Sequence, residues 1–534
     1  MAAKNASGNE AYSYNDRHFR EACKAILGGE VGGLSGLEGW LLALKQPMGG
    51  AKSSVSGEPL ALVSRDYPQG ARYLSMDEAF AAKPAPFSIN DIKDIDSLFV
   101  AARERFAYSG DLAFGNSQFV EASADVSDSF YIYRSARVSS CKAIACSTIV
   151  KDSSYLFGCN VASKDEYCMR CHQFTFDSRC FESNTTTSSS DCYYTYDCVG
   201  CKDTMFSFGQ RNAAHMIGNA HLPREKYLAL KSALLEQMRA ELVSKKKLPS
   251  FQGIFTAASR EPSALPQAAK SCACKFKGKT SIEPVQKAWD ATCRLVLGRE
   301  LGNIARFKGW LVRHNLGIRK VQSALGSGEI PAASYENLLA LPDSRYVNIG
   351  EARCLSKLLS LGEKEAESLT LSNAGKTLGK IAYVSPQFHE GTILNVSGSP
   401  IIMSSSDCEG VHGCIYMKRS AYSTWGRDSE HLFGSAFVLD SGFCIKCYNS
   451  FKIQNCFEVD SARLSTGCYF CHNIENCHDA IFCSNAKNLR YAVCNKEVGR
   501  GEFMRVKALL LARVNDEIGK TGGCRMDVYS IGEK

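Results

Sequence analysis

The residues of this chain that could bind a metal ion most readily are pairs of cysteines separated by two residues. Two such pairs stand out in each half of the 534-residue sequence: Cys168/Cys171 and Cys198/Cys201 in the first half, and Cys444/Cys447 and Cys468/Cys471 in the second. Cys-x-x-Cys pairs supply the thiolates of tetrahedral structural zinc sites. Because the chain lacks the basic-then-apolar order of a secretory signal, its 25 cysteines are expected to be free, buried or metal-bound rather than paired in disulfides.

The two halves of the chain are copies of each other. Residues 156–210 align without a gap on residues 432–486, at an offset of 276. Upstream, "CKAILGGEVGGLSGLEGWL" from Cys23 aligns on "CRLVLGRELGNIARFKGWL" from Cys293, at an offset of 270. Chance does not align Cys, Gly, Glu and Gly-Trp-Leu in this way. The chain is therefore a tandem duplication, with copy one near residues 1–262 and copy two near residues 263–534.

The duplication argues against zinc. The first pair of each half corresponds across the copies, whereas Cys198 falls on Ile474 and Cys471 falls on Thr195. A structural site that needs four ligands should keep all four or lose all four. We expect no metal and no other cofactor. If zinc does bind, the candidate ligands are Cys168, Cys171, Cys444 and Cys447.

A strict period of three runs through the cysteine-rich part of each copy. Every third residue in 126–207 and 402–483 is apolar or small, with Asp165 and Asp177 as the exceptions among 56 positions. A helix repeats every 3.6 residues and a flat strand every two, so neither explains this pattern. A parallel β-solenoid (β-helix) does, because its short strands turn at regular corners and send one residue of each triplet inward.

The length of one solenoid coil stays open between two values. A twelve-residue coil would stack Cys168, Cys180 and Cys192, whereas an eighteen-residue coil would stack Cys180 on Cys198. The alternation of an aliphatic and a small residue gives a working repeat of six. We favour the eighteen-residue coil where the core is aliphatic.

The inward register explains most of the cysteines as packing. Seventeen of the 25 fall on it, where they interchange with Ser, Thr, Val and Ala. Free cysteine behaves as a small, buried hydrophobe, which suits a narrow core. Ten cysteines that correspond across the copies are predicted to line the cores: Cys168, Cys171, Cys180, Cys192, Cys201, Cys444, Cys447, Cys456, Cys468 and Cys477.

Helical segments flank each solenoid. After the first solenoid, Tyr227, Leu230, Leu234 and Met238 form an apolar stripe, which predicts a helix that covers the open end. The fold class is mainly β with helical lead and capping segments. The expected units are a lead domain (1–110), solenoid (111–221), capping helix (222–248) and basic linker (249–284), followed by a lead domain (285–386), solenoid (387–497) and capping helix with tail (498–534).

Positive charge gathers outside the solenoids. Residues 120–207 hold 8 Lys and Arg against 11 Asp and Glu, whereas residues 223–280 hold 12 against 4. Phosphate contacts need concentrated basic residues, so nucleic acid is expected only at the basic helix and linker. Candidate contacts to an acidic partner are Lys245, Lys246, Lys247, Lys275, Lys277 and Lys279. Cys272 and Cys274 form a candidate exposed thiol pair in the same linker.

The sequence contains no recognisable catalytic constellation. Walker, HExxH, GxSxG and dinucleotide-binding motifs are absent. Some hexad-repeat acyltransferases use a histidine as general base, and His215 and His221 follow the first solenoid. Copy two has Tyr491 and Glu497 at those places, so we interpret both histidines as solvated or helix-capping residues.

The Cys-x-x-Cys and Cys-x5-Cys ladder, followed by a Lys-rich amphipathic helix, resembles cysteine-rich repeat proteins of unknown function in candidate-phylum bacteria and large phages. That resemblance implies a structural or assembly protein, such as a virion component, and no catalytic residues. We expect a non-enzymatic scaffold that binds other proteins or copies of itself in the cytoplasm or a virion. A membrane partner and export by a classical signal are not expected. The alternatives are a nucleic-acid-associated protein that uses the basic linker and an enzyme of the hexad-repeat acyltransferase type.

Overall fold

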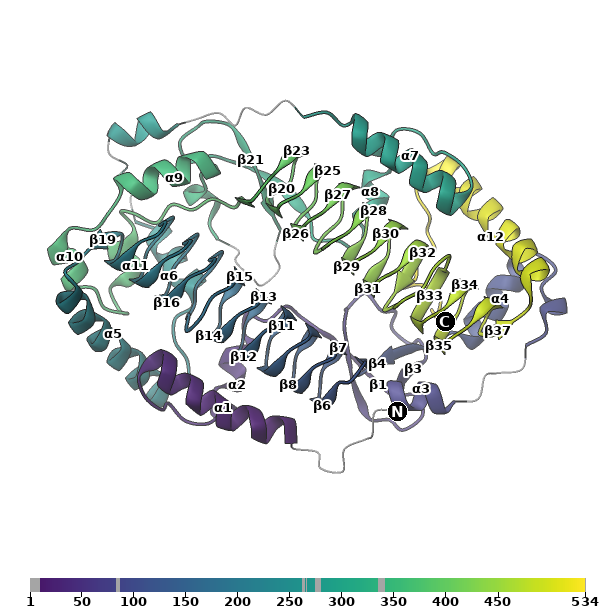
Figure 1. The fold of residues 1–534 in the computed structure, drawn as a ribbon, viewed down its shortest axis with the longest axis horizontal. Coiled ribbons are helices and arrows are strands. Elements are labelled where there is room, and N and C mark those ends of the chain that lie inside the picture. Colours follow the sequence, from purple (N-terminus) through teal and green to yellow (C-terminus); the bar gives the residue numbers. More distant parts are fainter. Residues whose placement is uncertain are drawn as a thin grey trace.

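The computed structural model of the chain describes residues 10–82, 87–261, 265, 267–273, 280–334 and 341–533. Two stacks of short, mostly parallel strands lie side by side, and helices run around their outer edges (Figure 1). Helix and strand each account for nearly a third of the residues, 30% and 31%. The expected mainly-β class is therefore only partly consistent with the structure, which mixes helices with many parallel sheets.

The first stack comprises β5 (Ala113–Phe114), β6 (Gln118–Glu121), β7 (Ala124–Ser127), β8 (Phe130–Tyr133), β9 (Ala136–Ser139), β10 (Lys142–Ala145), β11 (Thr148–Lys151), β12 (Ser154–Phe157), β13 (Asn160–Ser163), β14 (Glu166–Met169), β15 (His172–Thr175), β16 (Ser190–Tyr193), β17 (Lys202–Met205), β18 (Ala214–Ile217) and β19 (Ala220–His221).

The second stack comprises β22 (Phe388–Glu390), β23 (Leu394–Ser397), β24 (Ile401–Met403), β25 (Ser406–Glu409), β26 (Cys414–Ile415), β27 (Lys418–Ala421), β28 (Glu430–Phe433), β29 (Ala436–Leu439), β30 (Gly442–Ile445), β31 (Tyr448–Phe451), β32 (Gln454–Asp460), β33 (Tyr469–Glu475), β34 (His478–Ile481), β35 (Ser484–Lys487), β36 (Arg490–Val493) and β37 (Lys496–Glu497).

The flanking elements of copy one are α1 (Glu10–Leu27), α2 (Leu34–Leu42), β1 (Gly49–Lys52), β2 (Pro59–Leu62), β3 (Tyr73–Ser75), α3 (Met76–Ala81), η1 (Ile89–Asp91), α4 (Ile95–Arg105), β4 (Tyr108–Gly110), α5 (Arg224–Lys245) and α6 (Phe251–Ser259). Those of the connection and copy two are η2 (Gln267–Cys272), α7 (Glu283–Leu297), η3 (Ile304–Phe307), α8 (Lys308–Leu311), β20 (Ile318–Gln322), β21 (Glu329–Ala333), η4 (Asp343–Arg345), α9 (Ile349–Leu358), α10 (Glu363–Glu367), α11 (Ala374–Leu378) and α12 (Arg500–Thr521).

The strands pair with a register of twelve residues. Ile144 lies beside Ile132 on one side and beside Leu156 on the other, all three in parallel strands. The same step joins Cys444 to Cys456 in the second stack. The preference for an eighteen-residue coil in the aliphatic part is therefore wrong. Alternation of aliphatic and small residues repeats every six positions and is compatible with both lengths, so it could not decide between them.

The period of three has a backbone origin. From Asp125 to His215, nearly every third residue has a positive φ, as in Tyr131 (59°), Arg134 (48°) and Arg137 (53°). Left-handed conformations are uncommon for residues other than glycine, and Asn and Asp adopt them most readily. Here they turn the chain at the end of each short extended segment, so each twelve-residue step contains four turns.

The six-residue alternation of aliphatic and small inward residues reflects hydrogen bonds inside the stacks. In residues 126–159, aliphatic residues occupy the inward positions of the strands, whereas Ser and Cys occupy the inward positions between strands. At those positions the Ser135 hydroxyl accepts the backbone N–H of Ser147 at 3.1 Å, and the Ser147 hydroxyl accepts that of Cys159 at 3.0 Å. Cys141 does the same through its sulfur for Ser153, at 3.4 Å. Because buried N–H groups need partners, these small residues satisfy the backbone as well as fill space.

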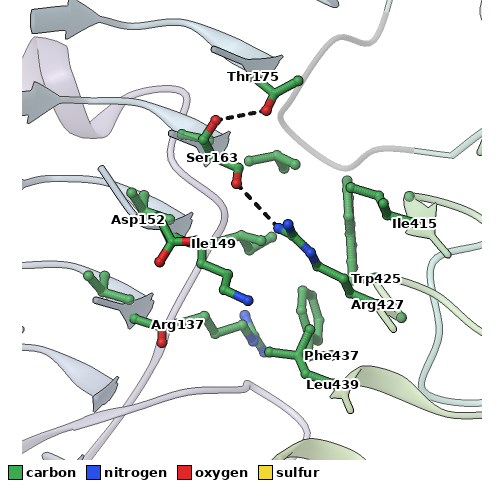
Figure 2. A pocket seen from close by; sticks show the side chains of 18 of the residues that line it. Arg137, Ile149, Asp152, Ser163, Thr175, Ile415, Trp425, Arg427, Phe437 and Leu439 are labelled. Atoms are coloured by element: carbon green, nitrogen blue, oxygen red, sulfur yellow. Dashed lines mark hydrogen bonds between the residues drawn. The ribbon is translucent and has the colours of Figure 1, made fainter. Parts of the chain in front are cut away.

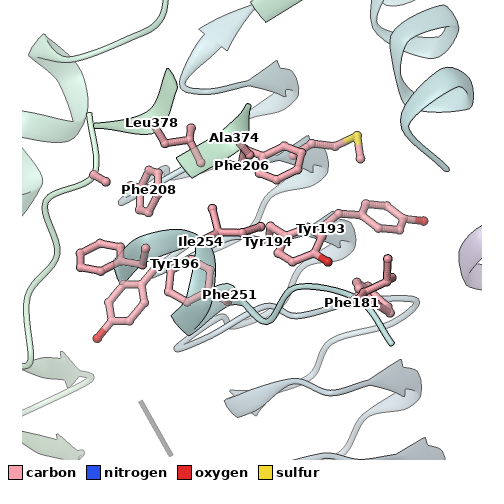
Figure 3. Close-up of a cluster of buried hydrophobic side chains, with 14 of the residues drawn as sticks. Phe181, Tyr193, Tyr194, Tyr196, Phe206, Phe208, Phe251, Ile254, Ala374 and Leu378 are labelled. Atoms are coloured by element: carbon pink, nitrogen blue, oxygen red, sulfur yellow. The ribbon is translucent and has the colours of Figure 1, made fainter. Parts of the chain in front are cut away.

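Each copy exchanges part of its lead segment with the other. The helix α1 packs along its own stack, but most of the buried hydrophobic side chains between residues 60 and 108 belong to the hydrophobic core around the second stack. Conversely, the buried side chains between residues 321 and 384 of copy two belong to the core around the first stack. Figure 3 shows Ala374 and Leu378 from copy two among Tyr194, Phe206 and Phe208 of the first stack. The expected lead domain 1–110 thus contributes to both cores.

The expected basic linker is partly a core element. In α6, Phe251, Ile254, Phe255 and Ala258 are buried against aromatic side chains of the first stack (Figure 3). Their i, i+3, i+4, i+7 spacing is the signal of an amphipathic helix. Sequence reasoning passed over it because the segment is short and its surroundings are polar.

A buried ion pair occurs at equivalent places in both copies. Arg170 pairs with Glu182 in the first stack, and Lys446 lies 3.5 Å from Glu458 in the second. In each case the basic group also donates to the backbone carbonyl of a buried tryptophan, Trp40 in copy one and Trp310 in copy two. The pairs therefore fix the lead helices to the stacks.

Candidate functional site

A cavity of about 500 Å³ lies between the two stacks. Its walls come from the facing strands β7, β9, β11, β13 and β15 of the first stack and β24, β26, β29 and β31 of the second. Figure 2 shows the side chains of both walls meeting in this space. A volume of this size is typical of small-molecule sites.

The stacks run in opposite directions across the cavity. Asp125, early in the first stack, lies 3.5 Å from Arg463, late in the second. Ser163, later in the first stack, accepts a hydrogen bond of 3.2 Å from Arg427, which lies early in the lined part of the second. Antiparallel packing of the duplicated stacks places early strands of one against late strands of the other, about a local two-fold relation centred on the cavity.

Residues that correspond across the duplication therefore line the same cavity. At the strand offset of 276, Lys151 corresponds to Arg427, and Val161 corresponds to Phe437. Lys151 ends β11, and Arg427 forms the matching parallel bridge in the second stack. Each copy thus contributes a basic residue to the cavity wall from the corresponding position of its own stack.

Aromatic and aliphatic side chains make up much of the cavity wall. Trp425 and Phe437 stand on the second stack with Leu439, opposite Ile149 of the first (Figure 2). The indole of Trp425 lies over Gly413, where any Cβ would collide with the ring. Gly413 has a φ of 66°, so it is suited to glycine for backbone as well as steric reasons.

Arg137 is held in the cavity by uncharged groups. Its Nε donates to Asn449 Oδ1 at 2.8 Å, and its guanidinium lies 3.8 Å from the centre of the Phe437 ring. Within the described part of the chain it forms no ion pair with a carboxylate. Burial lowers the pKa of Arg137, although the field of Asp125 acts in the opposite direction. A cation in this position is desolvated without a direct counter-ion.

Two other arginines line the cavity. Arg463 is 16% exposed, faces Asp125 and covers the ring of Phe114 at 4.0 Å. Burial raises the pKa of Asp125 despite the opposing effect of Arg463. Arg427 donates to Ser163, and its Nε lies 3.4 Å from Asp428 without forming a hydrogen bond.

A buried network of hydrogen bonds fixes Asn449, and through it positions Arg137. Asn449 donates to Asp460 at 2.7 Å, and Asp460 is 2.8 Å from Nδ1 of His472. The backbone N–H of Ser109 donates to Nε2 of His472 at 2.9 Å, so the imidazole carries its proton on Nδ1. Although burial opposes the effect, hydrogen bonds from His472 and Tyr67 lower the pKa of Asp460.

The predicted core-lining cysteines lie inside the stacks. All ten are at most 2% exposed. Cys180 lies between two single-residue parallel bridges and Cys468 directly precedes β33, whereas Cys168, Cys192, Cys444 and Cys456 lie in strands. Burial raises the pKa of the Cys141 and Cys414 thiols to about 12, which keeps them protonated. Among the residues that can be described, no three His, Cys, Asp or Glu side chains are grouped to hold a metal ion.

The predicted exposed thiol pair is wrong for Cys272. This residue is buried and forms a disulfide with Cys354 of α9. Cys274 lies outside the described residues. The prediction failed because the partner is 82 positions away and belongs to a segment that folds back from copy two.

Three of the six lysines predicted for an acidic partner can be placed. Lys245, Lys246 and Lys247 are exposed at the end of α5, where Lys245 pairs with Glu241 at 3.0 Å. Lys275, Lys277 and Lys279 lie outside the described residues.

The two histidines weighed as catalytic residues lie away from the cavity. The ring of His215 packs 5.5 Å from that of Tyr227, and His221 is exposed in the short strand β19. Neither contributes to the cavity wall.

Sequence reasoning did not select Arg137, Arg427 or Trp425. All three lie on outward positions of the triplet register, where charged and aromatic residues are common. The correspondence of Lys151 with Arg427 was the one signal in the sequence, because both copies keep a basic residue there.

Comparisons of the chain with protein-family models, with curated proteins and with solved structures find no match. In the described part of the chain, no helix is both long and apolar enough to cross a membrane.

Proposed function

We propose that each strand stack is a parallel β-solenoid with coils of twelve residues, and that the two solenoids form a non-enzymatic scaffold for protein assembly. The twelve-residue parallel register and the regular left-handed turns support the solenoid. Such a stack presents long outer faces and depends little on a deep pocket.

The exchange of lead segments is the observation that carries the scaffold proposal. Tyr67 of copy one donates to Asp460 in the second stack at 2.6 Å, and Tyr196 in the first stack donates to the backbone of Ser385 in copy two at 2.9 Å. Because each core includes a segment of the other copy, the stacks cannot reorient without opening both cores. A fixed double body of this kind suits the positioning of other proteins, in the cytoplasm or in a virion.

The exposed end of α5 is the candidate docking point for an acidic protein partner. Lys245, Lys246 and Lys247 lie there together, and Lys246 ends the helix in a left-handed conformation. Nucleic-acid binding at the same lysines is the alternative. Burial of α6 removes part of the expected linker from any such surface.

An enzyme is the second alternative, and the cavity between the stacks is the observation that favours it. No histidine is found among the residues that line this cavity within the described chain. A transferase that uses a histidine base would therefore need another site.

The test of the scaffold is chemical crosslinking of the tagged chain in cells that produce it, followed by mapping of the crosslinked lysines. We expect crosslinks from residues 245–247 to an acidic face of one protein at fixed stoichiometry, or to a second copy of this chain. The triple variant K245E/K246E/K247E should lose them, and K202Q, which removes an exposed lysine from β17, should not. Recovery of the chain only as a free 58.4 kDa monomer, or bound to nucleic acid alone, would contradict the proposal.

A further inference from the structure

The cavity between the stacks has the form of a binding site that the scaffold does not require. Two packed walls could meet in direct contact, as they do where Arg463 reaches Asp125. Beside these contacts and the cross-stack hydrogen bonds of Arg137 and Arg427, the walls leave a space of about 500 Å³. Figure 2 shows both arginine side chains directed into that space from opposite stacks.

The basic groups of this cavity are incompletely satisfied. Arg137 uses Nε for Asn449, and no hydrogen bond within the described chain engages its two terminal nitrogens. Arg427 uses Nη1 for Ser163, and its buried Nε lies 3.4 Å from the exposed carboxylate of Asp428 without a hydrogen bond. A guanidinium presents five N–H donors in a planar fork that matches a carboxylate or phosphate. The unused donors therefore favour an anion.

The four aspartates that line the cavity do not act as counter-ions for Arg137 or Arg427 in the described part of the chain. Asp125 faces Arg463, while Asp128 and Asp152 are exposed and reach solvent. Asp440 is partly buried and forms no ion pair among the described residues. None of the four is an ion-pair partner of Arg137 or Arg427 in this part of the chain.

The apolar wall defines the rest of the ligand. Trp425 is 7% exposed and stands with Phe437, Ile415 and Leu439 on one side, opposite Ile149. Flat aromatic side chains stack on planar apolar groups, and arginine beside an aromatic ring adds a cation–π component. The two rings already stack on each other, and Arg137 covers Phe437, but the apolar area that they still present to the cavity favours a ligand with an apolar body.

We propose that the cavity binds a small organic anion with a planar apolar body and one carboxylate or phosphate group. The anionic group is held by Arg137 of the first stack and Arg427 of the second, and the body lies against Trp425 and Phe437. Because the two arginines come from different copies, the ligand bridges the stacks and stabilises their packing.

The test uses 2-naphthoate as the anionic probe and 2-naphthalenemethanol as its neutral analogue, each titrated calorimetrically into the full chain. We expect one site for 2-naphthoate and at least about tenfold weaker binding of the alcohol, since hydrogen bonds to a charged group contribute that much or more. Quenching of tryptophan fluorescence should accompany binding, and W425F should remove most of it.

Two variants test the arginines. R137Q and R427Q should each weaken 2-naphthoate binding by about tenfold or more, with little effect on the alcohol. R427K should retain most of the affinity, because lysine occupies the corresponding place in copy one. K202Q, a charge removal outside the cavity, should leave the affinity unchanged.

A substitution that fills the cavity tests the proposal without altering any charge. V161F places in copy one the residue that copy two has at the corresponding position 437, where φ is similar (59° and 58°). It should abolish binding of both probes while the melting temperature is retained. Failure of 2-naphthoate to bind, equal affinity for the alcohol, or unchanged affinity in V161F or in folded R427Q would overturn the proposal.

Discussion

Tyr67 donates a hydrogen bond of 2.6 Å to Asp460, although 393 positions separate the two residues and they belong to different copies. The same carboxylate contacts Nδ1 of His472 and accepts a hydrogen bond from the side-chain amide of Asn449. The amide oxygen of Asn449 in turn accepts a hydrogen bond from Arg137 at the cavity. One buried acid thus connects the exchanged lead segment to the wall between the stacks.

Loss of the Tyr67 hydroxyl should destabilise the whole chain rather than one segment. Y67F leaves Asp460 with one donor fewer in a buried site, which costs about 1–3 kcal/mol of unfolding free energy. Y416F is the control, since Tyr416 is 52% exposed. Urea titration followed by circular dichroism measures both. A loss confined to the segment between residues 60 and 108, with the second stack unaffected in hydrogen exchange, would contradict the exchange as a structural lock.

The two carboxylates inside the first stack should make stability depend on pH. Burial raises the pKa of Asp165 to about 9 and that of Asp177 to about 7. An unfolded aspartate releases its proton near pH 4. Between these values the folded state holds more protons than the unfolded state, so stability falls as pH rises from about 4 to about 7 and, for Asp165, on to about 9.

Replacement of Asp165 by asparagine should remove its part of this pH dependence. Oδ1 of Asp165 accepts the backbone N–H of Asp177 at 2.7 Å, and Oδ2 has no partner in the described chain, so the amide keeps the one useful contact. Between pH 5 and pH 8, the wild type should lose up to about 1.4 kcal/mol per pH unit relative to D165N. D152N, at an exposed position of the same stack, should show no such gain. Parallel stability curves for wild type and D165N would refute the assignment.

A carboxylate should be far less tolerable at position 180 than at position 177. Asp177 receives the N–H of Ser189 at 2.7 Å, whereas the sulfur of Cys180 only donates, to Ser178 at 3.5 Å. C180S should cost about 1–3 kcal/mol and C180D several kcal/mol more, because no N–H is directed at the new charge. Denaturant titrations that give equal values for the two variants would exclude this account of the interior.

The cysteines should need no metal for folding. Purified protein is expected to contain far less than one zinc per copy by elemental analysis, and a chelator should leave the melting temperature unchanged. If thiolates bound zinc, the binding energy would be part of the folding energy, and chelation would unfold at least one copy. Stoichiometric zinc or iron would instead identify Cys168, Cys171, Cys444 and Cys447 as the first ligands to replace.

Much of the stack could be predicted from the sequence because its contacts repeat. Each strand pairs with a strand twelve residues later, and the inward positions, including those of Cys168 and Cys444, are visible as a period of three in the sequence. The duplication is visible because corresponding residues of the two halves align at a nearly constant offset. The hydroxyl and thiol contacts at the corners were not foreseen, since a small side chain shows its size in a sequence but not its hydrogen-bond partner.

The twelve-residue strand register, the exchange of segments and the cavity were decided only by the tertiary structure. Arg137 and Asn449 meet across 312 positions, and both occupy outward places where no period constrains the residue type. Contacts of this kind depend on how the two folded stacks pack against each other. That packing is set by the shapes of the stacks, by a few ion pairs between them and by apolar side chains that one copy alone would leave exposed. The sequence by itself determined a repeated core and a duplicated chain. The opposite directions of the stacks placed Arg137 and Arg427 in one cavity, because antiparallel packing brings strands from different levels of the two copies face to face.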